Sequence, residues 1–292
     1  MNLSDRWFSY LPLSQQFGSH LVDEMPEPPW SDAVGWSTAL RQTADLVEPD
    51  GVTVAGAGPI YVDLQQNAGV DPAEPGFEDA LGAASEEFRE TIRIIEDVRS
   101  EPVVPVVPGP VTICLEQFGG SWLDYLETDE FVALDALHAA SQLLTDLVRS
   151  FGGTIEGLVV DEPELSDAID GGLRLEDALL ETGAVFNVAD HHGLSVLGRS
   201  PESLFSSSSS LAESYDVVVF ETVSGEKLGS IGDVSIGGAF PETVWDGDDD
   251  DFEAGVGDYC ENMPEGFVLM PELPAATAPE RVRRFRELLD EV

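Results

Sequence analysis

Apolar residues divide the chain into two kinds of segment that alternate along its length. In one kind they recur at a spacing of three and four residues, and the longest example predicts an amphipathic helix over residues 76–100. Further helices are predicted over residues 36–48, 130–151, 175–192 and 278–292, with another beginning at Glu202. In the other kind, short apolar runs end at glycine, proline or acidic residues, which is typical of strands buried on both faces. Such strands are predicted over residues 52–55, 102–114, 155–160, 194–197, 216–220, 234–236 and 266–270.

The alternation of strands and helices predicts a parallel α/β sheet. About eight such units favour a (β/α)8 TIM barrel over a doubly wound sheet, in a single domain over residues 1–292. Residues 1–35 are expected to form an irregular cap, because their prolines interrupt both helix and strand patterns. Residues 56–64 show little periodicity, and the acidic block 246–251 is expected to be a solvated loop or the start of a helix.

One predicted strand ends in a pair of carboxylates. Residues 155–160 are mostly apolar and lead directly into Asp161, Glu162 and Pro163. Pro163 disfavours the α conformation at the preceding residue, which argues against a helix here. Because parallel α/β proteins bind ligands at the carboxyl ends of their strands, Asp161 and Glu162 are expected at the mouth of a site. A solvated loop is the alternative, and we prefer it for Glu164.

The acidic composition says more about environment than about chemistry. Thirteen basic and 57 acidic residues give a formal net charge of −44. This charge argues against nucleic acid or an anionic membrane as a partner, because it repels polyanions. The acidic residues are spread over every segment, which indicates a surface adapted to high salt and predicts a halophilic protein. The apolar runs exclude a disordered acidic chain.

Neither a disulfide framework nor a membrane segment is predicted. Two cysteines are too few for such a framework, and CxxC and HExxH motifs are absent. The N-terminus lacks a signal pattern, and no apolar run approaches the ~20 residues that span a bilayer, so a cytoplasmic protein is expected. There is no GxGxxG at a strand-to-helix turn and no GxxxxGK[ST] loop, so a nucleotide site is poorly supported.

Five motifs follow one another in the second part of the chain. They are GPVT at 109–112, VVDEPEL at 159–165, DVVVFE at 216–221, VSIGGAF at 234–240 and FVLMPELP at 267–274. Their order and spacing resemble the catalytic barrel of cobalamin-independent methionine synthase, whose superfamily includes uroporphyrinogen decarboxylase and the corrinoid methyltransferases. The resemblance covers residues 100–292, and FGSH at 17–20 is similar to the family's early GSFP turn. It implies a TIM barrel of this type, in a divergent, salt-adapted member.

The resemblance also implies roles for individual residues. Asp161 matches the aspartate that holds the amino group of the amino-acid thiol substrate, and Glu221 matches the acidic zinc ligand, so these are the predicted catalytic residues. The predicted substrate-binding residues are Asp161, Glu162, Arg199, Thr112 and His20. Arg199 follows a predicted strand and is the best anion anchor, with Arg6 as the other candidate.

The two predicted catalytic carboxylates carry an energetic cost. Unpaired carboxylates in a partly desolvated mouth are unfavourable unless a cation or a proton joins them. Arg199 is a candidate partner for Glu221, and the ammonium group of a substrate is the expected partner for Asp161. Asp161→Asn is therefore expected to leave the melting temperature nearly unchanged or to raise it.

The family's other zinc ligands have no counterpart here. Where the family has His-x-Cys, this chain has Leu197 and Arg199, and the final cysteine turn is replaced at residues 271–273. A zinc ion that activates a thiol needs thiolate and imidazole donors in tetrahedral geometry, which one carboxylate cannot supply. We therefore expect no metal cofactor, while a methylated folate or pterin stays open as a co-substrate.

Four residues could in principle replace the missing ligands. They are Cys114, Cys260, His191 and His192. Both histidines fall at a predicted helix C-terminus, where a cation interacts favourably with the helix dipole, so capping or exposure is the preferred interpretation. Cys114 follows a turn and is interpreted as a core thiol.

Three functions remain open. The first is a methyltransferase-like enzyme that handles a small amine- or thiol-bearing substrate without zinc. The second is a non-catalytic binding or regulatory barrel, acting with a protein partner or as a homodimer. The third is a decarboxylase of the uroporphyrinogen type, which needs no metal. We rank it last, because arginines that would bind substrate carboxylates are scarce.

Overall fold

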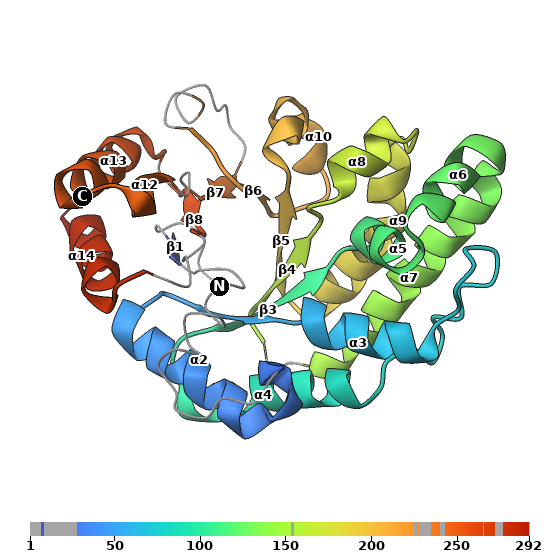
Figure 1. The fold of residues 1–292 in the computed structure, drawn as a ribbon, viewed down its shortest axis with the longest axis horizontal. Helices are drawn as coiled ribbons and strands as arrows, with labels where there is room; N and C mark the ends of the chain where they lie inside the picture. Colours follow the sequence, from blue (N-terminus) through green and yellow to red (C-terminus); the bar gives the residue numbers. More distant parts are fainter. Residues whose placement is uncertain are drawn as a thin grey trace.

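The computed structural model describes residues 7–8, 28–152, 155–224, 227, 235–239, 243–264, 266–271 and 277–291. Its strands form one parallel sheet in the order β1-β8-β7-β6-β5-β4-β3-β2. The strands are β1 Trp7–Phe8, β2 Val52–Ala55, β3 Val103–Pro108, β4 Gly157–Asp161, β5 Ser195–Ser200, β6 Val217–Phe220, β7 Ile236–Gly238 and β8 Val268–Leu269. The sheet curls into a half-barrel with helices around its outside, which is consistent with a TIM-barrel-like fold (Figure 1). Within the described residues, no pairing joins β1 to β2.

Helices fill the connections between the strands. The α-helices are α2 Ala33–Val47, α3 Ala57–Asn67, α4 Ala83–Val98, α5 Pro110–Phe118, α6 Gly120–Thr128, α7 Glu130–Phe151, α8 Leu165–Asp170, α9 Leu175–His191, α10 Ser208–Leu211, α12 Thr243–Asp246, α13 Asp249–Asn262 and α14 Pro279–Asp290. The described part of the chain also contains the 3-10 helices η1 Pro29–Ser31 and η2 Glu202–Ser207. The acidic block predicted as a loop or helix start is the beginning of α13, where Asp248 accepts a hydrogen bond from Asp251 N.

Two side-chain layers make up the core. Because side chains alternate between the two faces of a strand, every second residue points into the half-barrel and the others point toward the helices. The larger buried cluster lies between sheet and helices. A smaller inner cluster consists of Val104, Val106, Val159, Leu197, Val217, Val219, Val268 and Met270. This inner cluster is the apolar floor of the half-barrel.

The prediction of an irregular cap over residues 1–35 is wrong at β1. Trp7 and Phe8 pair in parallel with Val268 and Leu269 of β8. A strand of two residues is too short to show a periodic pattern of apolar residues. It is recognised only by its hydrogen bonds to a partner strand, so the sequence does not predict it. The rest of residues 1–27 lies outside the described part of the chain.

The ends of several elements differ from the sequence prediction. α3 forms where no element was predicted, because Pro59 falls in its first turn, where proline is tolerated, and Ile60 and Leu64 share its buried face. The helix predicted from residue 76 begins at Ala83 as α4. The strand predicted over residues 102–114 ends at Pro108 as β3, and Pro110 opens the helix α5, since proline is favoured at the first position of a helix. The short helices α6 and α8 were also missed, since each contributes few buried residues to a periodic pattern.

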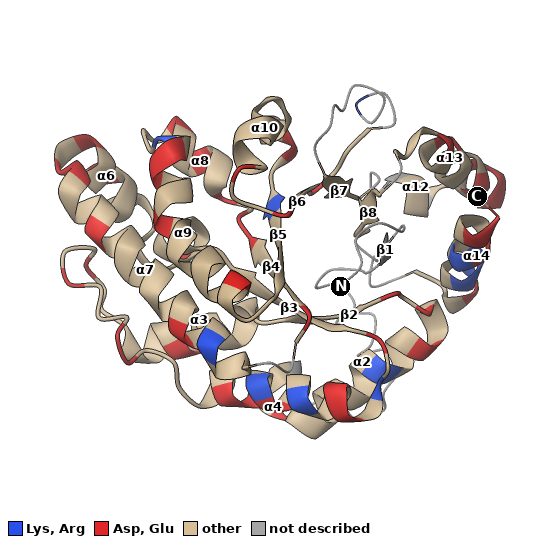
Figure 2. Ribbon diagram, turned by 180° about the vertical axis from the view of Figure 1, so that it is seen from behind, with Lys and Arg blue, Asp and Glu red and all other residues tan. Residues whose placement is uncertain are grey.

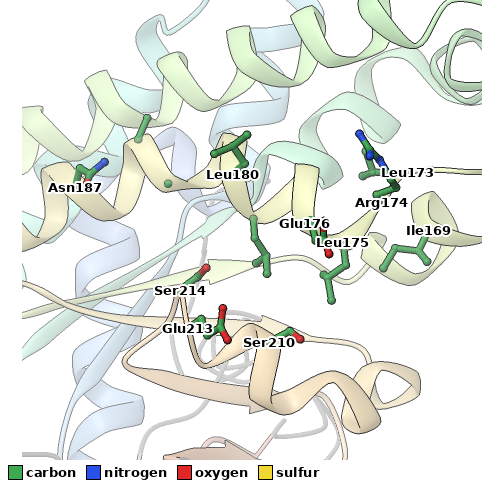
Figure 3. A pocket seen from close by; sticks show the side chains of 13 residues that line it. Ile169, Leu173, Arg174, Leu175, Glu176, Leu180, Asn187, Ser210, Glu213 and Ser214 are labelled. Atoms are coloured by element: carbon green, nitrogen blue, oxygen red, sulfur yellow. The ribbon is translucent and has the colours of Figure 1, made fainter.

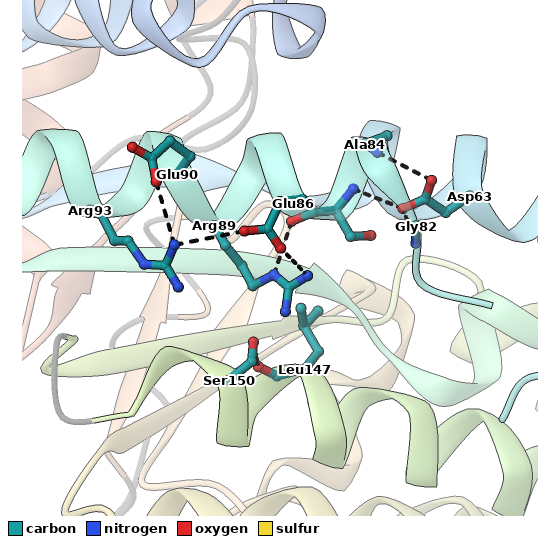
Figure 4. Close-up of polar contacts among 10 residues, drawn as sticks. Asp63, Gly82, Ala84, Glu86, Arg89, Glu90, Arg93, Leu147 and Ser150 are labelled. Atoms are coloured by element: carbon teal, nitrogen blue, oxygen red, sulfur yellow. Dashed lines mark hydrogen bonds and ion pairs between the residues drawn. The ribbon is translucent and has the colours of Figure 1, made fainter. Parts of the chain in front are cut away.

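A contact from another helix fixes the start of α4. The buried Asp63 of α3 accepts hydrogen bonds from Gly82 N (2.7 Å), Ala84 N (3.2 Å) and Ser85 N (2.8 Å). Figure 4 shows this carboxylate beside the first turn of α4. The backbone donors that open a helix have no partner within it, and here a distant side chain supplies one. The helix therefore starts where Asp63 reaches it.

α7 is the one described helix that is long and apolar enough to span a membrane, with 22 residues and a mean hydropathy of 1.2. This qualifies the expectation that no apolar run approaches such a length. α7 packs against α5, α6 and α9, and it buries Leu137, Leu144 and Val148. Since 56% of the apolar stretch of α7 is buried within the protein, we interpret α7 as a core helix among those that surround the half-barrel.

Candidate functional site

Three charged side chains lie above the apolar floor, at the carboxyl ends of neighbouring strands. Each follows a residue of the inner cluster by two positions, so it faces the same side of the sheet. These pairs are Val159 and Asp161 on β4, Leu197 and Arg199 on β5, and Val219 and Glu221 at the end of β6. Alternation along β4 and β5, together with the position of Glu221 directly after β6, therefore brings the three charges together inside the half-barrel.

Arg199 is part of β5 rather than a residue after it. The ladder continues past the predicted end of the strand, pairing Arg199 with Asp161 on β4 and with Val219 on β6. This extension corrects the predicted strand of residues 194–197. It also fixes the guanidinium beside both carboxylates.

The guanidinium of Arg199 lies between the two carboxylates. Its Nη1 is 3.0 Å from Asp161 Oδ1, 3.2 Å from Asp161 Oδ2 and 3.7 Å from Glu221 Oε1. The exposed fraction of the side chains rises from 7% for Arg199 to 15% for Asp161 and 35% for Glu221. The cation is thus the deepest group, and both carboxylates reach solvent above it.

Burial and pairing act in opposite directions on Asp161. Burial raises the pKa of Asp161, because it disfavours the charged form, and the charge and hydrogen bond of Arg199 oppose that rise. The ionised state of Asp161 therefore depends on Arg199.

Glu162 faces the opposite side of the sheet and contacts α5. It is 2% exposed, and its oxygens accept hydrogen bonds from Val111 N (3.2 Å), Thr112 N (2.9 Å) and Thr112 Oγ1 (2.8 Å). Burial raises the pKa of Glu162 to about 7, against the effect of these hydrogen bonds. The structure thus brings Glu162 and Thr112 together with each other, and their predicted contact with substrate stays a prediction.

Tyr61 is a candidate that sequence reasoning missed. It lies half-buried on α3, and burial raises its pKa most, followed by the negative charges of Glu116, Asp161 and Glu162. Its position in the connection after β2, near the carboxyl ends of the strands, was the available signal. That signal was lost because residues 56–64 were not assigned to an element.

The remaining predicted residues lie elsewhere. His20 and Arg6 fall outside the described residues, as do positions 272–273. Both His191 and His192 are exposed at the end of α9. Both cysteines are buried in the core, and burial raises the pKa of Cys114 well above its usual range.

The described residues do not fit a zinc site of the family type. Among them, no group of three or more His, Cys, Asp or Glu side chains is placed to hold a metal. The guanidinium of Arg199 lies 3.7 Å from Glu221 Oε1, and it repels a dication and cannot donate a lone pair to it. Both cysteines belong to the packed core, and burial raises the pKa of Cys114, which disfavours the thiolate that zinc needs.

A separate groove lies on the outside of the ring, between α9 and the α10 region (Figure 3). It has a volume of about 1050 Å³, and its lining mixes apolar side chains such as Leu175 and Leu179 with polar ones such as Asn187 and Glu213. None of the predicted site residues lines it.

The fold is similar to that of a methyltransferase from Methanosarcina mazei, with a TM-score of 0.75 and 15% sequence identity, covering 99% of this chain and 94% of that chain. At this identity the likeness shows the fold alone. A GH113 β-1,4-mannanase has a TM-score of 0.47 at 13% identity, covering 85% of this chain and 91% of that one. An oxaloacetate acetylhydrolase has a TM-score of 0.42 at 12% identity, covering 89% and 88%. These two values are too low to carry an argument, and no family model and no curated protein matches the sequence.

Proposed function

We propose that the protein is a methyltransferase-like (β/α)8 barrel of the methionine synthase type, which binds a small amine-bearing thiol at the ends of β4, β5 and β6 without zinc. The observation that carries the proposal is the guanidinium of Arg199 between Asp161 and Glu221 above an apolar floor. Barrel enzymes place their chemistry at this end of the strands. The fold likeness to a methyltransferase supports the reaction class.

Asp161 is the proposed contact for the substrate ammonium. A carboxylate can accept about four hydrogen bonds, and Nη1 of Arg199 contacts both Asp161 oxygens. The partly exposed Asp161 side chain therefore keeps acceptor capacity on its solvent side. An ammonium placed there would form a charge-assisted hydrogen bond and would favour the ionised carboxylate.

Glu221 is the proposed proton acceptor for the thiol. In the transfer, the sulfur–methyl bond forms as the bond between methyl and donor nitrogen breaks, and that nitrogen keeps the electron pair. The thiol proton passes to Glu221, the most exposed of the three charged groups, and the donor nitrogen takes up a proton from solvent as it leaves. A methylated folate or pterin is the proposed donor class. Arg199 orients both carboxylates and, unlike zinc, does not bind the sulfur.

A matched pair of ligands tests the amine contact. In molar KCl, we expect homocysteine to raise the melting temperature and 4-mercaptobutyrate, which lacks the amine, to leave it unchanged. Asp161→Asn should weaken homocysteine binding by roughly 2 to 5 kcal/mol, the scale for removing one partner of a buried charged pair. Equal shifts with both ligands would contradict the proposal.

Elemental analysis tests the absence of zinc. Protein purified without added metal is expected to contain far less than one equivalent, because a guanidinium stands beside Glu221. One equivalent of tightly held zinc would overturn this part of the proposal.

A non-catalytic binding barrel is the second candidate. It is favoured by the replacement of the family's zinc ligands with Leu197 and Arg199. Single-turnover assays with homocysteine and methylated folates or pterins separate the two functions. Binding of homocysteine without any methyl transfer would favour the binding protein.

A further inference from the structure

We infer that Glu162 is a positioning residue that ties the carboxyl end of β4 to the start of α5 and thereby holds Asp161 against Arg199. The inference rests on the proposed function in one respect, namely that Asp161 binds the ligand. Glu162 itself would not contact the ligand, because its oxygens are engaged by Val111 and Thr112.

The side chain of Glu162 supplies the cap that α5 lacks. The N-cap residue of α5 is Gly109, which has no side chain to accept a hydrogen bond from the first turn. The carboxylate of Glu162 accepts from two backbone N–H groups of that turn and from the Thr112 hydroxyl. Such donors have no partner within the helix, and the helix dipole favours a negative group at this end.

Backbone hydrogen bonds hold the same point of β4 from both sides. Gly109 N donates to Asp161 O at 2.7 Å, and Glu162 N donates to Arg199 O at 2.9 Å. The peptide between Asp161 and Glu162 is thus fixed to the turn after β3 on one side and to β5 on the other. Because the two residues are adjacent, a shift of the Glu162 side chain also moves the Asp161 carboxylate relative to Arg199.

The close approach of Glu162 to α5 requires glycine at position 109. A Cβ built on Gly109 would lie 2.0 Å from Glu162 Cδ and 2.1 Å from Glu162 Oε1. Glu162 is fully buried, so it cannot move aside without losing its hydrogen bonds. Gly109→Ala therefore loosens the contact while leaving the charge of Glu162 in place.

The charge of Glu162 links this contact to pH. The titratable groups that face it are Asp161, Tyr61, Cys114 and Tyr215. Burial raises the pKa of Glu162 to about 7, and its ionised form accepts the α5 hydrogen bonds more strongly. The contact should therefore tighten as pH rises through 7.

The test measures Asp161 directly, without any ligand. The carboxyl carbon of Asp161, assigned by comparison with Asp161→Asn, is titrated by ¹³C NMR in Gly109→Ala and Thr112→Val. Both variants keep the Glu162 carboxylate, so its charge on Asp161 does not change. If the pair between Asp161 and Arg199 loosens, the pKa of Asp161 should rise, because Arg199 holds it down. Homocysteine affinity should fall by about tenfold to a hundredfold, the scale for a displaced binding group.

The matched control is Asp63→Asn. Asp63 is also a buried carboxylate that accepts from the first turn of a helix, but that helix is α4. The control should lower the melting temperature while leaving both the Asp161 titration and homocysteine affinity unchanged. The control thus distinguishes a general loss of stability from a displacement of the Asp161 carboxylate.

The outcomes separate this inference from the proposed function. An unchanged Asp161 titration in both variants would overturn the positioning role, even if Thr112→Val weakened homocysteine binding by removing a direct contact. If Gly109→Ala did not fold, Thr112→Val alone would decide. If wild-type protein did not bind homocysteine, the proposed function would fail, and the titration would still decide the role of Glu162.

Discussion

At the scale of single residues, the pair of Asp161 with Arg199 changes the expected effect of a mutation. From the sequence, two unpaired carboxylates predict that Asp161→Asn leaves the melting temperature unchanged or raises it. In the structure, both Asp161 oxygens contact the buried guanidinium of Arg199. Removing the charge of Asp161 leaves that cation less compensated, so the sign reverses.

We therefore expect Asp161→Asn to lower the free energy of unfolding by about 1 to 3 kcal/mol, the cost of weakening a buried charged hydrogen bond. Chemical denaturation in molar KCl measures this change. Asp124→Asn, which removes the same charge from an exposed position on α6, is the control and should be neutral or slightly stabilising. A stabilised Asp161→Asn would show that the pair with Arg199 is not maintained in solution.

Glu162 gives the protein a predictable pH dependence. Its folded-state pKa of about 7 lies above the ordinary value of 4.5, so the folded state binds more protons than the unfolded state between these values. Stability should then decrease as pH rises from 4.5 to 7, by up to roughly 3 kcal/mol from this group.

The measurement compares denaturation curves at pH 5 and pH 8, in molar KCl to screen the other carboxylates. Glu162→Gln, which cannot titrate, should lose this part of the pH dependence. An identical slope in the two proteins would mean that Glu162 is ionised throughout.

At the scale of elements, contacts from distant residues decide where helices begin. α4 starts at Ala83 because Asp63 accepts hydrogen bonds from its first turn, and α5 starts at Pro110 beside Glu162. The periodic pattern that predicted a helix from residue 76 includes Phe77, which is buried in the preceding connection. The periodicity of apolar residues indicates which side chains are buried. The residue that caps the N-terminus determines where the helix begins.

Asp63→Asn should lower the free energy of unfolding by about 1 to 2 kcal/mol, because an amide cannot accept all three hydrogen bonds as well as a carboxylate. Hydrogen exchange should accelerate at the amides of Gly82, Ala84 and Ser85. The exposed N-cap Asp248 of α13 is the comparison. Asp248→Asn should lower the free energy of unfolding by only about a few tenths of a kcal/mol, because asparagine is an equally good cap in water. Equal costs at the two caps would contradict the long-range role of Asp63.

At the scale of the whole molecule, acidic and basic residues are distributed differently over the surface. Figure 2 shows acidic residues on helices around the ring, whereas basic residues gather on α4 and α14. Those arginines form ion pairs with acidic neighbours, for example Arg284 with Glu253 and Arg89 with Glu86. The carboxylates that make up the net charge of −44 therefore repel one another across the surface.

The melting temperature should consequently rise steeply between dilute buffer and molar KCl, because salt screens repulsion in the compact state. An equal osmolality of sucrose is the control for effects other than screening, and it should raise the melting temperature less. A flat response to KCl would contradict the halophilic interpretation and would point to a cationic partner.

The sequence by itself determined the positions of β2 to β8 along the chain, most of the long helices and their order. Buried strands and amphipathic helices have local patterns, which is why β2 and α7 match their predicted bounds. The sequence also placed Asp161, Arg199 and Glu221 at strand ends, because apolar runs stop there. Their roles in binding and catalysis stay predictions.

Only the tertiary structure decided which groups meet. The β4–β5 and β5–β6 registers set Arg199 between Asp161 and Glu221, and the position of α5 places the start of that helix against the Glu162 carboxylate on the other side of the sheet. Likewise, β1 exists as a strand through its pairing with β8. These contacts join residues tens to hundreds of positions apart, so they depend on how whole elements pack, which no local pattern of apolar and polar residues records.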